Sequence, residues 1–448
     1  MVAVSFVKYI SIILLIFVTT SLATHKAIVH PELFKGRTDE DTAVLKINED
    51  ITLNLEQGND LHEEFFLRTY RQGVPQHRYY NIEALQEDLY HDKRRLAAVF
   101  ITEEEGTLKV EGVVGPDLKI KPVVGAERSE EGHIPHLLES IEESDRDRFY
   151  GKMPETTPLQ VSPRNRGFDE TKYKVPYVTP EIFVVVDSYF HAGFNTTAEM
   201  MKYLLTTFRV VNLRYLGVKD PKVQLIFRGV EVSTRRQDDE YYAYLSYTAQ
   251  IDGLKSLYNI VKYVEKKNET YWKYDMVYFL TGLDMVAVEG SRREKSLAGF
   301  AFVASACTKS REQLGEDTPY SFRGIRIMAH EVGHTSFDAS CLHHNNSKTT
   351  KFMLKKWTTK YRLPGDKLSL NMQCRMTYPT LYNTYYLERY GIRRCMAECF
   401  VPGHQFHASN SHWPMLLIDG TECDKKNKLV CINGDCRAWK RPRKFTPP

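Results

Sequence analysis

The middle third of the chain alternates apolar runs with amphipathic stretches. An uninterrupted apolar run at residues 182–187 predicts a buried strand, and a helix is expected from about 197 to 215. A second strand is expected at 223–227, a second helix at about 252–266 and a third strand at 276–281. This βαβαβ order predicts an α/β fold with a mixed, mostly parallel twisted sheet.

Another strand is expected just before the most informative segment of the chain. Residues 299–303 (Gly-Phe-Ala-Phe-Val) alternate small with large side chains, and a helix-compatible apolar stretch follows at 325–329. We therefore expect strand 299–303 to lie beside the candidate site described below. A substrate peptide could pair with such a strand.

The first part of the chain has a different pattern. Strand-like runs at 97–102 and 108–114 predict a β-rich module, which contains no cysteine. Residues 139–170 are charged and rich in proline, which is typical of an exposed linker, and cleavage is expected there near Arg148 or Arg166.

The N-terminus has the features of a secretion signal. Lys8 precedes an apolar run at 10–18, and small residues around Ser21 and Ala23 offer a cleavage site, so residues 1–23 are interpreted as a signal peptide. The run is shorter than the roughly 20 apolar residues of a membrane-spanning helix, and no later segment could span a bilayer. The sequence therefore predicts a secreted, extracellular protein.

Composition narrows the class of protein. The chain has 448 residues, of which 42% are hydrophobic and 26% charged, with a formal net charge of +4, as in ordinary globular proteins. The dense basic cluster is confined to 440–444, so nothing indicates nucleic-acid binding. All eight cysteines lie between Cys307 and Cys436, and an even number behind a signal peptide predicts disulfides. Asn195, Asn268 and Asn345 open glycosylation motifs.

Residues 330–334 read His-Glu-Val-Gly-His, the H-E-x-x-H signature of zinc proteases. On a helix, positions four apart share a face, so His330 and His334 can bind one metal ion. Glu331, one position further round, can reach a water molecule at that metal. Two histidines and a glutamate can match this spacing by accident, but the preceding apolar stretch favours Zn²⁺ as the cofactor.

The order of these parts resembles the reprolysin (adamalysin) branch of the metzincins, and most closely the salivary metalloproteases of ticks. The resemblance is carried by residues 183–187, 280–284, 315–317, 328–334, 419–423 and 431–436. It implies a propeptide with its linker at 24–170, a catalytic domain at 176–396 and a disulfide-rich module at 397–448. It also implies a monomeric enzyme that acts on extracellular proteins such as fibrinogen or matrix components.

The third zinc ligand is the point at which the sequence departs from this family. The family motif continues H-E-x-x-H-x-x-G-x-x-H-D, but an ungapped alignment puts Phe337 at the glycine and Ser340 at the third histidine. Three extra residues in the turn would instead make His343 the third ligand, which we prefer because three nitrogen ligands plus water are expected of catalytic zinc. Asp338 and His344 are the competing candidates.

The resemblance implies further roles. Met376, or Met372, would be the methionine of the Met-turn that lies beneath zinc in metzincins. The implied disulfides are Cys307 with Cys395 and Cys341 with Cys374, which leaves the other four cysteines to crosslink the C-terminal module.

Latency in the family often depends on a propeptide cysteine, which this chain lacks, since its first cysteine is Cys307. His133 and His136 are possible zinc blockers, although solvent exposure is the expected state of both. Latency, where it exists, would then come from occlusion of the cleft or from another ligand.

Two functions remain open from sequence. In the first, a zinc metalloendopeptidase uses Glu331 as general base for hydrolysis. In the alternative, Phe337 and Ser340 mark decay of the site, and the chain is an inactive secreted protease fold that binds host proteins. A protease inhibitor built on the C-terminal cysteines has little support, because that segment is small.

Overall fold

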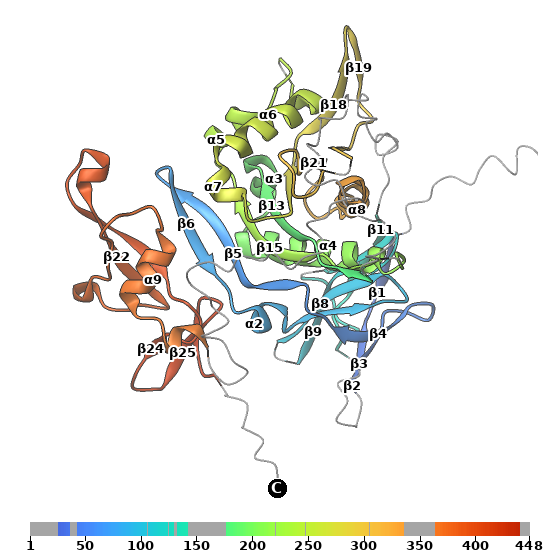
Figure 1. The fold of residues 1–448 in the computed structure, drawn as a ribbon. Helices are drawn as coiled ribbons and strands as arrows, with labels where there is room; N and C mark the ends of the chain where they lie inside the picture. Colours follow the sequence, from blue (N-terminus) through green and yellow to red (C-terminus); the bar gives the residue numbers. More distant parts are fainter. Residues whose placement is uncertain are drawn as a thin grey trace, which may run out of the picture.

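The computed structural model describes residues 26–35, 43–104, 106–123, 125–129, 132–141, 176–219, 221–246, 248–303, 305–335 and 363–439. The described residues form an N-terminal module, a central α/β domain and a C-terminal module (Figure 1). Within these ranges, no helix is long and apolar enough to cross a membrane.

The N-terminal module is built on an antiparallel sheet. In the described residues its strands follow the order β1-β11-β10-β9-β8-β7-β4-β3-β2. Their bounds are β1 (Lys26–Val29), β2 (Glu32–Lys35), β3 (Ala43–Lys46), β4 (Thr52–Gln57), β7 (Leu89–Asp92), β8 (Ala97–Glu104), β9 (Thr107–Gly115), β10 (Leu118–Pro122) and β11 (His136–Ser140). Its own core lies between strands that contribute alternate apolar residues such as Leu45, Val99 and Val110.

The central domain contains a second sheet, with the order β20-β21-β17-β13-β15-β5-β6 among the described strands. The bounds are β5 (Leu61–Arg71), β6 (Val74–Tyr79), β13 (Glu181–Val186), β15 (Ile226–Val232), β17 (Met276–Thr281), β20 (Gly299–Ala301) and β21 (Glu312–Glu316). Strands β5, β15, β13, β17 and β21 run parallel, whereas β20 and β6 are antiparallel to their neighbours. Two strands from before residue 80 therefore extend this sheet.

Helices cover both faces of this sheet. Their bounds are α2 (Ile82–Gln86), α3 (Ser188–Ala192), α4 (Thr197–Tyr215), α5 (Arg235–Tyr241), α6 (Gly253–Lys266), α7 (Asn268–Tyr271) and α8 (Gly324–Thr335). Short strands flank them, namely β12 (Tyr177–Val178), β14 (Lys222–Val223), β16 (Gln250–Asp252), β18 (Asp284–Glu289) and β19 (Arg292–Glu294). α4 lies between this sheet and the N-terminal sheet, where it contacts β8 and β9 (Figure 1).

The expected helix at 197–215 is confirmed, because α4 has those bounds and Thr196 caps it by accepting a hydrogen bond from the Glu199 N–H. The expected strand at 276–281 is confirmed as β17, and the helix at about 252–266 as α6, capped by Asp252. The second expected strand was misplaced: β15 begins at Ile226 and runs to Val232. Strand β21 was not predicted.

The C-terminal module is a chain of short elements that begins at the first described residue after 362. Its elements are η4 (Pro364–Asp366), α9 (Leu370–Thr377), η5 (Glu388–Tyr390), β22 (Met396–Val401), η6 (Gly403–Phe406), β23 (Ser411–Leu416), β24 (Glu422–Asp424), β25 (Leu429–Ile432) and β26 (Asp435–Arg437). α9 packs with residues that follow 396 and also contacts β6 of the central sheet (Figure 1).

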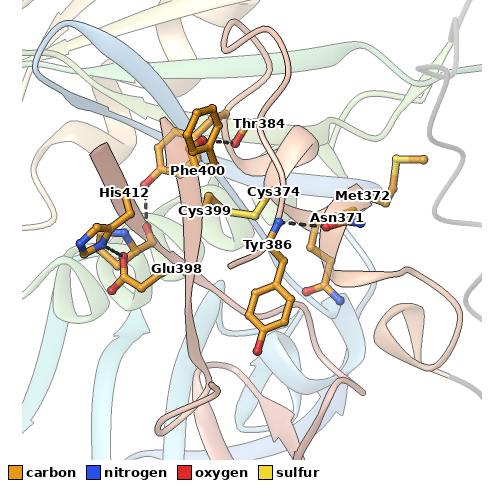
Figure 2. The surroundings of a disulfide bond; sticks show 12 residues. Asn371, Met372, Cys374, Thr384, Tyr386, Glu398, Cys399, Phe400 and His412 are labelled. Carbon is orange, nitrogen blue, oxygen red and sulfur yellow. Dashed lines mark hydrogen bonds and ion pairs between the residues drawn. A yellow bond between two sulfur atoms is a disulfide. The ribbon is translucent and has the colours of Figure 1, made fainter. Parts of the chain in front are cut away.

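Three disulfides hold this module together: Cys374–Cys399, Cys395–Cys431 and Cys423–Cys436. Figure 2 shows the first, which links α9 to β22 next to the hydrogen bond that the Tyr386 N–H donates to Asn371 Oδ1. The implied pairs Cys307–Cys395 and Cys341–Cys374 are wrong, because Cys395 and Cys374 have other partners. Cys307 is also disulfide-bonded.

The expectation that Met376 forms a Met-turn beneath the histidines is also wrong, because this residue belongs to the C-terminal module. Met376 lies on α9 and packs against Leu368 and Ile418, with Tyr79 and Met372 at the edge of the cluster. α9 and the histidine-bearing helix α8 lie in separate parts of the molecule (Figure 1). The methionine therefore stabilises the C-terminal module and does not lie beneath the histidines.

The observed pairing can be checked by mapping. Proteolytic digestion without reduction, followed by mass spectrometry, is expected to yield peptides joined as Cys374–Cys399, Cys395–Cys431 and Cys423–Cys436. A reduced digest is the control, in which the joined masses disappear. Recovery of a Cys307–Cys395 peptide would contradict the arrangement of α9 and β22.

Candidate active site

The histidine pair lies on α8, which is fixed at both ends by buried polar side chains. At its start, Asp317 Oδ1 accepts a hydrogen bond of 2.9 Å from the Gly324 N–H, and Tyr203 donates one of 2.6 Å to Asp317 Oδ2. At its end, Gln313 of β21 donates a bond of 2.8 Å to Thr335 Oγ1. These anchors orient the helix without involving the histidines.

His330 and His334 present their ring nitrogens to one another. Their Nε2 atoms are 2.9 Å apart and the ring planes are nearly perpendicular. Two imidazole ligands of a tetrahedral zinc would have nitrogen atoms about 3.3 Å apart, from Zn–N bonds of about 2.0–2.1 Å. The pair thus lies within a few tenths of an ångström of a zinc-binding arrangement. Burial and the neighbouring His334 lower the pKa of His330, which favours the neutral form that binds metal.

Glu331 points to the other side of the pair, against the edge strand β20. Its side chain is buried, with 1% of the residue exposed, and Oε1 has no hydrogen-bond partner among the described residues. Burial raises its pKa to about 8. A buried carboxylate oxygen without a partner is costly in a purely structural helix, and so its presence beside two facing histidines fits a site that holds a metal and a water.

Gly299 of β20 makes room for this carboxylate. A Cβ atom at residue 299 would lie 2.5 Å from Glu331 Oε1 and 2.9 Å from its Cδ. The predicted strand beside the site is therefore confirmed, although it ends at Ala301 and not at Val303, and its glycine allows the backbone to approach the glutamate. The role of Gly299 was not foreseen, although the alternation of small and large residues in 299–303 contained the signal.

A pocket of about 490 Å³ opens next to the histidines. It is lined by Arg214, Tyr215, Val218, Val303, Ala329, His330, Gly333 and His334. Tyr215 ties its two helical walls together by donating a hydrogen bond of 2.7 Å to the Ala329 carbonyl oxygen. The pocket is large enough for an amino-acid side chain of a bound peptide.

The remaining candidate ligands lie outside the described residues: His343, His344, Asp338 and Ser340. Within the described ranges, the one group of three close His, Cys, Asp or Glu donors is Cys395, Cys423 and Cys436, and all three form disulfides. The metal hypothesis therefore depends on His330 and His334 with a third ligand from residues 336–362.

The possible zinc blockers do not behave as expected. His136 is 1% exposed, not solvent-exposed, and its Nε2 accepts a hydrogen bond of 3.0 Å from the Val110 N–H within the N-terminal sheet. This contact makes His136 a structural residue of that sheet. His133 is partly buried in the loop before β11.

Comparison with known proteins agrees with this geometry. Residues 201–339 match the metallopeptidase family M12B, reprolysin-like. This part of the chain is similar to a reprolysin-type metallopeptidase domain. The matched segment runs from α4 through α8 and thus includes His330, Glu331 and His334.

Similar proteins include arthropod metalloproteinases. A silkworm (Bombyx mori) protein described as "A disintegrin and metalloproteinase with thrombospondin motifs like" is 27% identical over 55% of this chain and 44% of its own length. A metalloproteinase of the scorpion Tityus obscurus is 24% identical over 73% of this chain and 88% of its own, and venom metalloproteinase 3 of the wasp Eulophus pennicornis 22% over 61% and 65%. The chain thus spans less than half of the silkworm relative. A solved chaperone–substrate complex aligns at a TM-score of only 0.25, with 15% identity over 36% of this chain and 26% of that one.

Gly299→Ala tests the position of the glutamate. The added methyl group is expected to displace the Glu331 carboxylate and to lower kcat/KM for a quenched peptide by about 10- to 100-fold, because small misplacements of a catalytic group are costly. Zinc content should not change, since neither histidine is touched. Gly217→Ala is the control, because its Cβ would lie 3.6 Å from the Arg214 carbonyl oxygen, an ordinary contact. Wild-type activity in Gly299→Ala would contradict the proposed role of this carboxylate.

Proposed function

We propose that the chain is a secreted zinc-dependent metalloendopeptidase that hydrolyses peptide bonds in extracellular proteins. The observation that supports this proposal best is the pair of facing Nε2 atoms on α8 beside the buried Glu331, whose Oε1 has no hydrogen-bond partner among the described residues. The match to a metallopeptidase family over the same helix supports the reaction class.

His330 and His334 would hold the metal, with His343 as the preferred third ligand. Zinc, when bound in such a site, supplies a Lewis acid that polarises a carbonyl group and makes water more acidic. Glu331 would then accept the proton of the attacking water and deliver it to the leaving amine. Buried Gly299 and its strand keep the carboxylate directed into this region.

Strand β20 would position the substrate. It forms the antiparallel edge of the central sheet, with β21 as its neighbour, and Val303, just beyond its end, lines the pocket. An extended peptide could add to this edge and place one side chain in the pocket next to His330. This arrangement suits an endopeptidase, because main-chain pairing does not need a free end of the substrate.

The apolar run at 10–18 supports passage through the secretory pathway, and two of the similar proteins are scorpion and wasp metalloproteinases. We propose residues 1–23 as the signal peptide, 24–170 as a pro-region with a cleavable linker, 176–396 as the catalytic domain and 397–448 as a cysteine-rich segment, which supplies most of the C-terminal module described above. Monomeric action on fibrinogen or matrix proteins, as in tick saliva, remains a prediction from resemblance.

The inactive binding protein is the second candidate. Phe337 and Ser340 stand where the family has a glycine and a zinc-binding histidine. Glu331 is buried, and its Oε1 has no hydrogen-bond partner in the described part of the chain. This favours the enzyme, because a site without function would be more stable without the buried carboxyl group.

The general-base role predicts different outcomes for two variants. Glu331→Gln should keep one zinc per chain but lower kcat at least 100-fold, as expected on removal of a general base. His334→Ala should lose zinc and activity together. Glu289→Gln, an exposed position at the end of β18, is the control for the substitution itself. Full activity of Glu331→Gln would rule out the mechanism.

The third ligand is tested by zinc content and peptide cleavage measured on the same samples of His343→Ala. Loss of both zinc and cleavage would establish His343, with the exposed His412→Ala as control. If the His343→Ala variant still contains zinc, Asp338 or His344 would become the candidate third ligand. A folded wild-type protein with neither zinc nor cleavage would favour the binding protein.

A further inference from the structure

Strand β5 occupies an interior position in the central sheet, although it precedes the expected linker. It pairs in parallel with β15, with Phe66 opposite Gly229 and Arg68 opposite Glu231. Phe65 and Leu67 pack into the core shared with α4, whereas Phe66 packs into the core on the opposite face. A strand buried on both faces belongs to the core of the domain it completes.

Two buried charges have partners in residues 26–141, which comprise the N-terminal sheet together with β5 and β6. The first of these charges is Glu231 of β15. The residue is fully buried, and its carboxylate accepts hydrogen bonds from Arg68 Nη1 at 2.6 Å, from the Tyr70 hydroxyl at 2.7 Å and from the Tyr271 hydroxyl at 3.0 Å. Arg68 and Tyr70 both belong to β5. Arg68 is itself 4% exposed, so the pair is shielded from water. Removal of β5 would leave the carboxylate with a single tyrosine among these partners.

The second buried charge is Arg209 in the middle of α4, 2% exposed. Each partner that its guanidinium contacts comes from residues before 92. It pairs with Asp60 and donates to Gly58 O at 3.0 Å, Gln86 Oε1 at 2.9 Å and His91 Nδ1 at 3.1 Å. Burial and the adjacent cation lower the pKa of His91 to about 4, so its nitrogen is free to accept this bond. The backbone at Gly58 lies so close to the Arg209 guanidinium that a Cβ atom at this residue would collide with it.

The hairpin of β5 and β6 also holds the C-terminal module. Gln76 donates hydrogen bonds to the Tyr378 hydroxyl at 3.1 Å and to the Pro414 carbonyl oxygen at 3.3 Å, and Arg78 donates one to Asn433 O at 3.1 Å. Val74 belongs to the apolar core of that module. The hairpin lies between the central domain and the C-terminal module (Figure 1).

We propose that residues 26–141 remain bound as a non-covalent subunit after the linker at 142–175 is cut, and that the processed protein is a complex of two fragments. The partner of the central domain at this surface is thus its own N-terminal module, bound by strand addition and by two buried charge networks. The first cysteine is Cys307, so no disulfide can hold the N-terminal fragment. The inference does not depend on peptidase activity.

The test uses the full chain with Glu331→Gln, so that no self-cleavage occurs, and with a recognition sequence for a specific protease placed in 142–175. After cutting, size-exclusion chromatography and native mass spectrometry are expected to show both fragments together in a one-to-one complex. They should separate only in denaturant. Two separate species in native buffer would overturn the proposal, whatever the zinc content.

Arg68→Leu in the same background shows whether the buried network carries the association. We expect the dissociation constant of the cut pair to rise at least about 100-fold, because Glu231 loses its cation in a buried setting. Arg128→Leu is the matched control, since Arg128 is exposed and bonds within its own module. An unchanged dissociation constant for Arg68→Leu would refute the role of this network. Where Arg68→Leu does not fold, the cutting experiment on the Glu331→Gln chain with Arg68 intact decides by itself.

Discussion

A carboxylate inside an apolar sheet needs a cation, and the Glu231–Arg68 pair meets that need across two parts of the chain. Burial alone would lower the pKa of Arg68, but Glu231 together with the neighbouring tyrosines raises this pKa above its ordinary value. The guanidinium also lies 5.3 Å from the centre of the Phe183 ring on β13. This one interaction fixes the parallel register of β5 on β15, because a shift of one residue would put Arg68 on the opposite face. The hairpin and the C-terminal module that it contacts follow from that register.

The site depends on a separate set of buried polar contacts at the other edge of the sheet. Asp317 and Gln313 hold the two ends of α8, and β20 presses against Glu331. These contacts hold the histidine-bearing helix in place through residues other than the histidines, so this side of the site is preorganised. Asp187 at the end of β13 plays a similar part: it accepts hydrogen bonds from Thr281 and Gly282, and burial raises its pKa to about 7.

Local pattern was enough to predict elements whose burial is simple. α4 could be located because Thr196 caps it and apolar residues fill its turns, and β17 because it is an unbroken apolar run. β15 was misplaced because Arg228, Gly229 and Glu231 interrupt its pattern, and their partners are far away in sequence, with Arg68 separated from Glu231 by 163 residues. β5 was missed for the same reason. The disulfides depend on how α9 docks on β22, which no spacing of cysteines reveals. At the site, one sequence motif predicted His330, Glu331 and His334. The roles of Asp317 and Gly299 could not be predicted, because their contacts with α8 form only when the chain folds.

The N-terminal module also contacts the elements around the pocket. These contacts include a partly exposed ion pair, whereas the networks of Glu231 and Arg209 are buried. Asp117 pairs with Arg326 on α8, Lys119 Nζ donates to the Tyr320 carbonyl oxygen at 3.0 Å, and Arg214 donates weakly to the Pro116 carbonyl oxygen at 3.4 Å. The Asp117–Arg326 pair is partly exposed, and such pairs contribute about 0–1 kcal/mol. Attachment of the module and access to the pocket therefore depend on different interactions. The contacts of the turn between β9 and β10 with α8 are thus of a weaker kind than the buried networks that hold β5 in the sheet.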